Sequence, residues 1–112
     1  MKKFEGLIAA PFTPMDKNGE VVFDAIPWYY EFLEKNKVVG AFINGSTGEG
    51  VSLSQTEKMK IVECWTARSR AKKTVKVINL VGGTSYKECI ENARHSAENG
   101  VDAIALLAPL LF

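Results

Sequence analysis

The chain has 112 residues, of which 46% are hydrophobic and 24% are charged, and its formal net charge is +1. These fractions are those of a globular protein and argue against a disordered, collagen-like or disulfide-dense chain. The balanced charge gives no field that favours nucleic acid or an anionic membrane, and every apolar run is shorter than the roughly 20 residues that cross a bilayer. The two cysteines, Cys64 and Cys89, are expected to be free, buried thiols in a reducing cytoplasm.

The first apolar run covers residues 6–14 and contains two prolines near its end. It predicts a buried strand that breaks into a loop. Asp24 is the expected N-cap of the following helix, which is predicted to end near Asn36. Ile26, Tyr30 and Leu33 follow at helical spacing within it.

A second apolar run, residues 38–43, predicts another buried strand. After a polar segment, Ser54 and Glu57 have the spacing of a capping box, in which each side chain bonds the other residue's backbone amide. The helix that begins there is expected to run to about Ala71, with Trp65 on its inner face.

A third strand is predicted over residues 74–81 and a fourth over residues 102–109. Between them, Ser85 and Glu88 form a second capping-box pattern at the start of a third helix. In this helix Ile90, Ala93 and Ala97 are spaced three and four residues apart, which is the pattern of an apolar helix face.

The predicted order is β-α-β-α-β-α-β, with strands recurring about every 32 to 36 residues, which is typical of βαβ units. Apolar strands without alternation predict a parallel sheet covered on both faces. An open doubly wound sheet and part of an eight-stranded barrel both fit this pattern. Because a closed barrel takes about 250 residues, the chain would be less than half of such a domain.

The loop at residues 45–50 is the one segment whose pattern points to chemistry. It contains three glycines, and it adds the hydroxyls of Ser46 and Thr47 after the carboxyl end of a predicted strand. Glycines let successive amides face one anion, and ligands bind at this end of parallel strands in both candidate architectures. The loop therefore predicts a small site for a carboxylate or a phosphate, with a tight capped turn as the alternative. Neither a GxGxxG motif nor a Walker lysine supports nucleotide binding.

The segment of residues 42–49, Phe-Ile-Asn-Gly-Ser-Thr-Gly-Glu, resembles the signature of the N-acetylneuraminate lyase and dihydrodipicolinate synthase family. The resemblance runs along essentially the whole chain, in family order and spacing. Ser46 and the Ala9–Ala10 pair are more similar to the sialic acid lyases of the family than to the synthase. The flanking segments that also fit are residues 6–10, 13–15, 53–57 and 108–109.

The resemblance implies the N-terminal portion of a (β/α)8 TIM barrel and class I aldolase chemistry without a metal or organic cofactor. In this chemistry a lysine forms a Schiff base with pyruvate and a tyrosine handles protons. Carried over to this chain, Ser46 and Thr47 would bind the carboxylate of the pyruvate moiety, while Gly45, Gly48 and Glu49 would support the loop. Donors that are fixed before a charged group arrives suit this role.

The family's lysine and tyrosine correspond to positions beyond Phe112, so no catalytic residue is expected in this chain. We interpret residues 1–112 as an incomplete barrel domain, the first three βα units plus strand 4, and expect it to be inactive alone. The full protein is expected to be a carbon–carbon lyase that splits N-acetylneuraminate into N-acetylmannosamine and pyruvate. The resemblance further suggests a cytoplasmic homotetramer without nucleic-acid or membrane partners.

Three alternatives stay open on the sequence. The first is dihydrodipicolinate synthase or another 2-oxo-acid aldolase of the same family. The second is a non-catalytic half-barrel that acts as an interaction module. The third is an open α/β domain whose loop binds phosphate.

Two further features are expected to be structural. His95 is expected to be a solvated helix residue, and the basic residues 68–73 are expected to form a solvated helix end.

Overall fold

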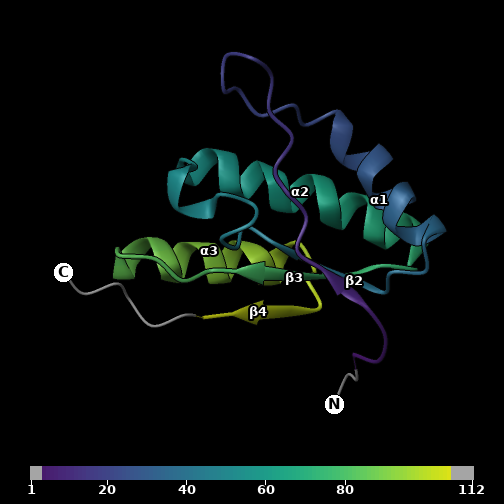
Figure 1. Cartoon of the computed structure of the whole chain (residues 1–112). Helices are drawn as coiled ribbons and strands as arrows, with labels where there is room; N and C mark the ends of the chain where they lie inside the picture. Colours follow the sequence, from purple (N-terminus) through teal and green to yellow (C-terminus); the bar gives the residue numbers. More distant parts are fainter. Residues whose placement is uncertain (1–3, 107–112) are drawn as a thin grey trace.

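The computed structural model describes residues 4–106, which form a four-stranded sheet with three α-helices on one side of it (Figure 1). All neighbouring strands are parallel, and they lie in the order β1-β2-β3-β4. The order of strands and helices is therefore the one that the sequence predicts. In chain order the elements are β1 (Ile8–Ala9), α1 (Ala25–Lys35), β2 (Gly40–Ile43), the 3-10 turn η1 (Gly50–Ser52), α2 (Gln55–Lys72), β3 (Lys76–Leu80), α3 (Tyr86–Glu98) and β4 (Ala103–Ala105).

The two faces of the sheet have different environments. Along β3 the side chains of Val77 and Asn79 are buried beneath the helices, whereas the alternating residues Lys76, Ile78 and Leu80 are half-exposed. Within residues 4–106 the expectation of cover on both faces is therefore wrong. An apolar second face is also what the interior wall of a barrel requires, because strands rather than helices fill that space. The strand register places on this open face Ile8, Phe42, Ile78, Leu80, Ala103 and Ala105.

The main hydrophobic core lies between the sheet and the helices. Trp65 in α2 is 2% exposed and packs against the rings of Tyr29 and Tyr30 in α1, with ring centroids 5.8 and 6.2 Å away. This confirms Trp65 as an inner-face residue of its helix. The core comprises Ile26, Tyr30, Leu33, Ala41, Ile43, Leu53, Ile61, Val62, Trp65, Val75 and Val77.

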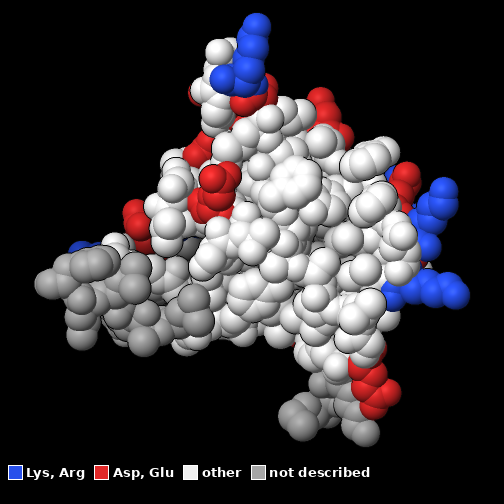
Figure 2. All heavy atoms as spheres, in the orientation of Figure 1, with Lys and Arg blue, Asp and Glu red and all other residues white. Residues whose placement is uncertain are grey.

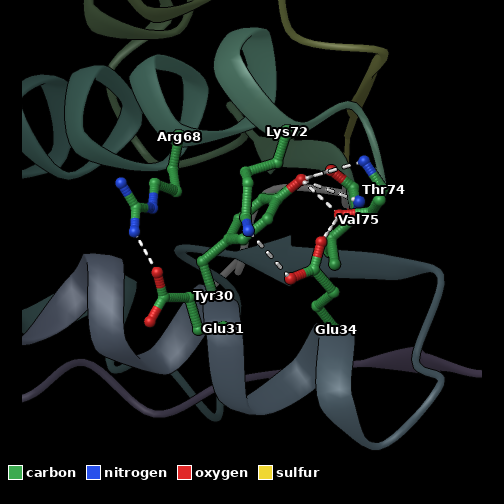
Figure 3. A network of polar contacts seen from close by, with 7 residues as sticks. All are labelled: Tyr30, Glu31, Glu34, Arg68, Lys72, Thr74 and Val75. Carbon is green, nitrogen blue, oxygen red and sulfur yellow. Dashed lines mark hydrogen bonds and ion pairs between the residues drawn. The ribbon is translucent and has the colours of Figure 1, made fainter.

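A buried tyrosine ties α1 to the segment before β3 (Figure 3). Tyr30 is 0% exposed, and its hydroxyl oxygen accepts the backbone N–H of Val75 at 2.8 Å and that of Thr74 at 3.2 Å. The ring thus fills the core while its polar end satisfies backbone groups that burial would otherwise leave without partners.

The basic end of α2 lies against acidic residues of α1. Arg68 pairs with Glu31, and the Lys72 ammonium lies 3.4 Å from a carboxylate oxygen of Glu34 (Figure 3). The hydroxyl of Thr74 also donates to Glu34, and this bond, with the positive charge of Lys72, holds the pKa of the Glu34 carboxyl below its usual value. Residues 68–73 therefore form a helix end that pairs with a neighbouring helix.

The helix ends agree with the sequence only in part. At α2 the capping box is complete, since Ser54 accepts the amide of Glu57 at 3.1 Å and Glu57 accepts that of Ser54 at 2.8 Å. At α3 only half of the box forms, with Ser85 accepting the amide of Glu88 at 3.3 Å. Asp24 precedes α1 as expected, but its side chain makes no capping bond.

The inner face of α3 is polar, whereas the spacing in its sequence predicts an apolar one. Ile90, expected inside, is 40% exposed, whereas Asn92 and Ser96 are buried. The reason is that β3 presents the amide of Asn79 to this helix, and its Nδ2 donates to the Ser96 hydroxyl at 2.8 Å. Leaving a buried amide without a hydrogen-bond partner costs more free energy than leaving an apolar side chain partly exposed.

His95 also differs from its expected solvated state. Its side chain is only 16% exposed, and Nε2 lies 2.8 Å from a carboxylate oxygen of Glu63 in α2. This contact links the outer parts of α2 and α3.

The free thiols of Cys64 and Cys89 lie in the same two helices and are half-buried rather than fully buried. Burial raises the pKa of the Cys64 thiol.

The molecular face shown in Figure 2 carries few charges, and the Lys, Arg, Asp and Glu side chains gather at its margins. Large apolar side chains remain exposed near β1 and α1: Leu7 is 72% exposed, Phe12 59% and Trp28 64%. The rings of Trp28 and Phe32 stack with centroids 5.7 Å apart. The aromatic residues of α1 are thus divided, with Tyr29 and Tyr30 in the packing and Trp28 and Phe32 at the surface.

Candidate functional site

The loop that follows β2 is closed by its own backbone. The amide of Glu49 donates to the carbonyl of Ser46 at 3.0 Å, and the amide of Gly50 donates to the carbonyl of Gly45 at 3.0 Å. Glu49 adopts the left-handed conformation with φ of 58°, and its side chain is exposed. Gly50 has no room for a side chain, since an added Cβ would lie 2.1 Å from the carbonyl oxygen of Asn44. The loop therefore has one compact shape rather than an extended one.

Two hydroxyl residues stand at the exposed tip of this loop. Ser46 and Thr47 are exposed, while Gly45 and Gly48 on either side of them are buried. Among residues 4–106, neither the hydroxyls nor the backbone amides of Ser46 and Thr47 have a protein hydrogen-bond partner. These four donors on adjacent residues, at the carboxyl end of β2, are therefore available to a small anion.

A side chain from the segment after β1 holds the far end of the loop. The hydroxyl of Thr13 donates to the carbonyl oxygen of Gly48 at 2.6 Å, and Thr13 is only 8% exposed. An added Cβ on Gly48 would lie 3.3 Å from the carbonyl oxygen of Pro11. The β1–α1 segment therefore packs directly on Gly48, where only glycine fits without displacement.

A chain of buried polar side chains holds the near end. Asn44, which has a left-handed φ of 59°, donates from Nδ2 to Oδ1 of Asn79 at 2.9 Å. Asn79 in turn donates to Ser96 of α3 at 2.8 Å, so the loop is connected to β3 and α3. The Oδ1 atom of Asn44 is buried without a hydrogen-bond partner within residues 4–106.

A cavity of about 370 Å³ lies between this loop and the loop that follows β3. Ser46 lines it, but Thr47 does not, so the two hydroxyl residues do not both face the same hollow. Other lining residues include Lys58 and Glu88, near the N-terminal ends of α2 and α3.

The lysine in β3 lies at the other end of the sheet. Lys76 is the first residue of β3, and its ammonium lies 5.1 Å from the ring centre of Phe4. A hollow of about 380 Å³ there is lined by Phe4, Lys73, Lys76 and their neighbours. This arrangement places Lys76 away from Ser46 and Thr47, which follow the carboxyl end of β2.

Within residues 4–106, no three His, Cys, Asp or Glu side chains lie close enough together to hold a metal ion. No helix in this part of the chain is both long and apolar enough to span a membrane.

Sequence reasoning finds the hydroxyl residues of the loop but misses the two anchors, Thr13 and Asn44. Both act through contacts with residues 35 positions away, which local spacing does not show. The signals for Thr13 in the sequence are its place immediately before Pro14 and the fit of residues 13–15 to the family, and neither indicates its contact with Gly48. The predicted end of strand 4, including Ala108–Pro109, and Phe112 lie outside the described residues.

The sequence and the fold of this chain are both similar to those of one known protein family. The sequence matches the Dihydrodipicolinate synthetase family over residues 3–112. N-acetylneuraminate lyase of Mus musculus is 46% identical over 112 residues, a match that covers 99% of this chain and 35% of the relative. The chain thus spans about a third of the length of the curated relatives it matches.

Solved structures of the family agree in fold. The structure of N-acetylneuraminate lyase from Aliivibrio salmonicida has a TM-score of 0.92 and 33% identity, covering 100% of this chain and 37% of that one. A prophage protein of the dihydrodipicolinic acid synthase family from E. coli K12, solved in complex with pyruvate, has a TM-score of 0.86 and 28% identity, covering 95% and 35%. The four parallel strands match the N-terminal part of these TIM barrels, which confirms the predicted fold class.

Proposed function

Because the chain belongs to the dihydrodipicolinate synthetase family of aldolase-type enzymes, we propose that it is the N-terminal part of a lyase that cleaves N-acetylneuraminate. The products are N-acetylmannosamine and pyruvate, formed through a Schiff base between a lysine and the keto acid. The mammalian relatives that share almost half of its residues are named for this activity.

The loop after β2 binds the carboxylate of the pyruvate moiety in this proposal. The observation that carries it is the set of unpartnered donors on Ser46 and Thr47, within residues 4–106, on a backbone held in one shape. A carboxylate accepts several hydrogen bonds, and donors fixed in advance bind it without a reorganisation cost. The pyruvate complex of a relative supports the choice of anion.

The reacting groups belong to polypeptide outside this chain. Lys76 cannot substitute for the Schiff-base lysine, because it lies at the opposite end of the sheet from residues 45–50, the hydroxyl loop. We therefore propose that residues 1–112 form an incomplete barrel domain and that the isolated chain has no lyase activity. A cytoplasmic homotetramer that needs no metal or organic cofactor completes the proposal.

A chimera tests the proposal directly. The 112-residue chain replaces the matched N-terminal segment of the A. salmonicida lyase, whose remaining strands supply the later part of the barrel. We expect this lyase chimera to release pyruvate from N-acetylneuraminate and to trap pyruvate covalently on reduction with borohydride. The isolated chain should do neither. A folded chimera without activity would count against the lyase and in favour of a non-catalytic half-barrel.

Variants of the chimera identify the binding residues. Replacing both Ser46→Ala and Thr47→Val should raise the KM for N-acetylneuraminate at least tenfold, because charge-assisted hydrogen bonds are lost, each contributing about 1.5–3 kcal/mol. Ser52→Ala is the matched control, since Ser52 is exposed in the adjacent turn η1 and is not part of the proposed donor set. Equal KM values for the double variant and the control would refute the carboxylate site.

A related function within the family is the second candidate. Dihydrodipicolinate synthases share the Schiff-base chemistry, and the same loop would bind pyruvate in both enzymes. The similarity of the fold to a solved dihydrodipicolinate synthase structure supports this second candidate. An assay of the full-length gene product with N-acetylneuraminate decides between them, because the residues that choose the aldehyde lie mostly outside this chain.

A further inference from the structure

We infer that Thr13 is a positioning residue for the keto-acid carboxylate: its hydroxyl holds the carbonyl of Gly48 and so fixes the amides of Ser46 and Thr47. This inference rests on the proposed function of the loop, because it assigns Thr13 a part in binding the same carboxylate. Thr13 does not touch the substrate itself, and it acts through the loop backbone.

The hydrogen bond from Thr13 holds a part of the loop that no hydrogen bond within the loop holds. The carbonyls of Gly45 and Ser46 accept amides from within the loop. Among residues 4–106, the carbonyl of Gly48 has the Thr13 hydroxyl as its hydrogen-bond donor, at 2.6 Å. Gly48 is buried, so losing this donor leaves a carbonyl oxygen that water reaches poorly.

Thr13 is itself held firmly enough to act as an anchor. The carbonyl of the next residue, Pro14, accepts the amide of Val22 at 2.8 Å, and Met15 forms an antiparallel bridge with Val21. The segment after β1 is thus bonded to the segment before α1. Thr13 therefore joins two loops of the carboxyl edge of the sheet through a short bond between groups 35 residues apart.

A displaced loop should weaken binding more than it slows the reaction. The carboxylate is bound in the substrate and in the transition state alike, and an interaction common to both changes KM while leaving kcat nearly constant. We expect Thr13→Val in the lyase chimera to raise KM for N-acetylneuraminate and Ki for pyruvate about tenfold, with kcat changing less than about threefold.

Two companion variants separate positioning from simple packing. Thr13→Ser keeps the hydroxyl and removes a methyl group, so it should restore KM to within about twofold of the unsubstituted chimera. Thr66→Val is the matched control: Thr66 is 1% exposed and its hydroxyl donates to the carbonyl of Val62 at 2.8 Å within α2, away from the loop. It should lower the melting temperature without changing KM.

Each outcome has a meaning. Equal KM values for Thr13→Val and Thr66→Val would overturn the inference, and so would a high KM that Thr13→Ser fails to rescue. If Thr13→Val does not fold, Thr13→Ala removes the same hydroxyl and is interpreted in the same way. If neither folds while Thr66→Val does, Thr13 is purely structural and the inference is wrong. A normal Thr13→Val together with a defective Ser46/Thr47 double variant refutes only the inference, whereas a normal double variant refutes the proposed carboxylate site.

Discussion

The hydroxyl of Tyr30 accepts the backbone N–H of Val75 at 2.8 Å, and this bond joins the first helix to the residue before β3 (Figure 3). Tyr30 is fully buried, so the amide of Val75 has no water to replace this partner. The bond holds α1 in place over the sheet. In the same helix, the ring of Tyr29 packs against Phe12, with centroids 5.0 Å apart, in the segment that contains Thr13.

Tyr30→Phe should therefore reduce the free energy of unfolding by about 1–3 kcal/mol, because it removes the acceptor of a buried amide. Urea unfolding of the lyase chimera, followed by circular dichroism, measures the change. Tyr29→Phe is the control, since the Tyr29 hydroxyl has no protein hydrogen-bond partner within residues 4–106, and it should cost less than about 0.5 kcal/mol. Equal losses for the two variants would contradict the role of the hydroxyl.

Glu34 should make stability depend on acidity. Its pKa is held below the usual value, first by the hydroxyl of Thr74 and then by Lys72. A lowered pKa in the folded state means that the ionised carboxyl stabilises the fold above its unfolded-state pKa, and that this stabilisation is lost as the pH falls through the folded-state pKa.

Melting temperatures of the chimera and its Glu34→Gln variant should therefore differ at neutral pH and converge as the medium becomes more acidic than the folded-state pKa of Glu34. Glu98→Gln is the matched control, because Glu98 ends α3 and has no ion-pair partner within residues 4–106. A Glu34→Gln difference that persists unchanged in acid would show that lost packing, rather than lost charge, is responsible.

Gly50→Ala should disrupt the hydroxyl loop. Its new methyl group would lie 2.1 Å from the carbonyl oxygen of Asn44, and backbone cannot move aside as a flexible side chain can. We expect a loss of about 1–3 kcal/mol, the usual cost of overpacking, together with weaker trapping of pyruvate by borohydride. Gly83→Ala tests the same change in the loop after β3, where an added Cβ has no neighbour within 4 Å, and should leave both measurements unchanged. Normal trapping by Gly50→Ala would show that the loop tolerates another shape.

The bond between Asn79 and Ser96 should appear as a coupling energy. Single alanine variants and the double variant form a cycle whose interaction energy we expect to be about 1 kcal/mol, because the two side chains bond each other inside the core. Combining Asn79→Ala with Ser52→Ala provides the comparison, since Ser52 is exposed in η1 and those effects should add within about 0.5 kcal/mol. An Asn79–Ser96 cycle that is equally additive would remove this bond from the account of α3.

Local patterns predict the elements well, and long-range polar contacts explain the failures. The capping box of Ser54 and Glu57 is a local arrangement, so its spacing is sufficient to find the start of α2. The inner face of α3 is predicted wrongly because the apolar spacing of Ile90 does not include the demand of Asn79 for a hydrogen-bond partner. Asn79 belongs to β3, so the sequence of α3 alone does not show that this helix must supply its hydrogen-bond partner.

The hydroxyl loop shows the same division. Its glycines and hydroxyls stand together in the sequence, so local spacing is enough to select Ser46 and Thr47 as candidates. Their exposure and unpartnered donors within residues 4–106 are compatible with that selection, and the carboxylate role stays a prediction. The anchors Thr13 and Asn44 require the fold, because each contacts a partner brought near only by the parallel pairing of strands.

Both anchors of the loop come from polypeptide that precedes Gly100. Thr13 follows β1, and the series of side-chain hydrogen bonds that begins at Asn44 passes through Asn79 to Ser96. On a ribosome that makes a longer relative, these segments leave the exit tunnel earlier than the strands that follow them in sequence. In such a protein the proposed carboxylate site can thus take its shape early in translation, before the lysine that is proposed to form the Schiff base.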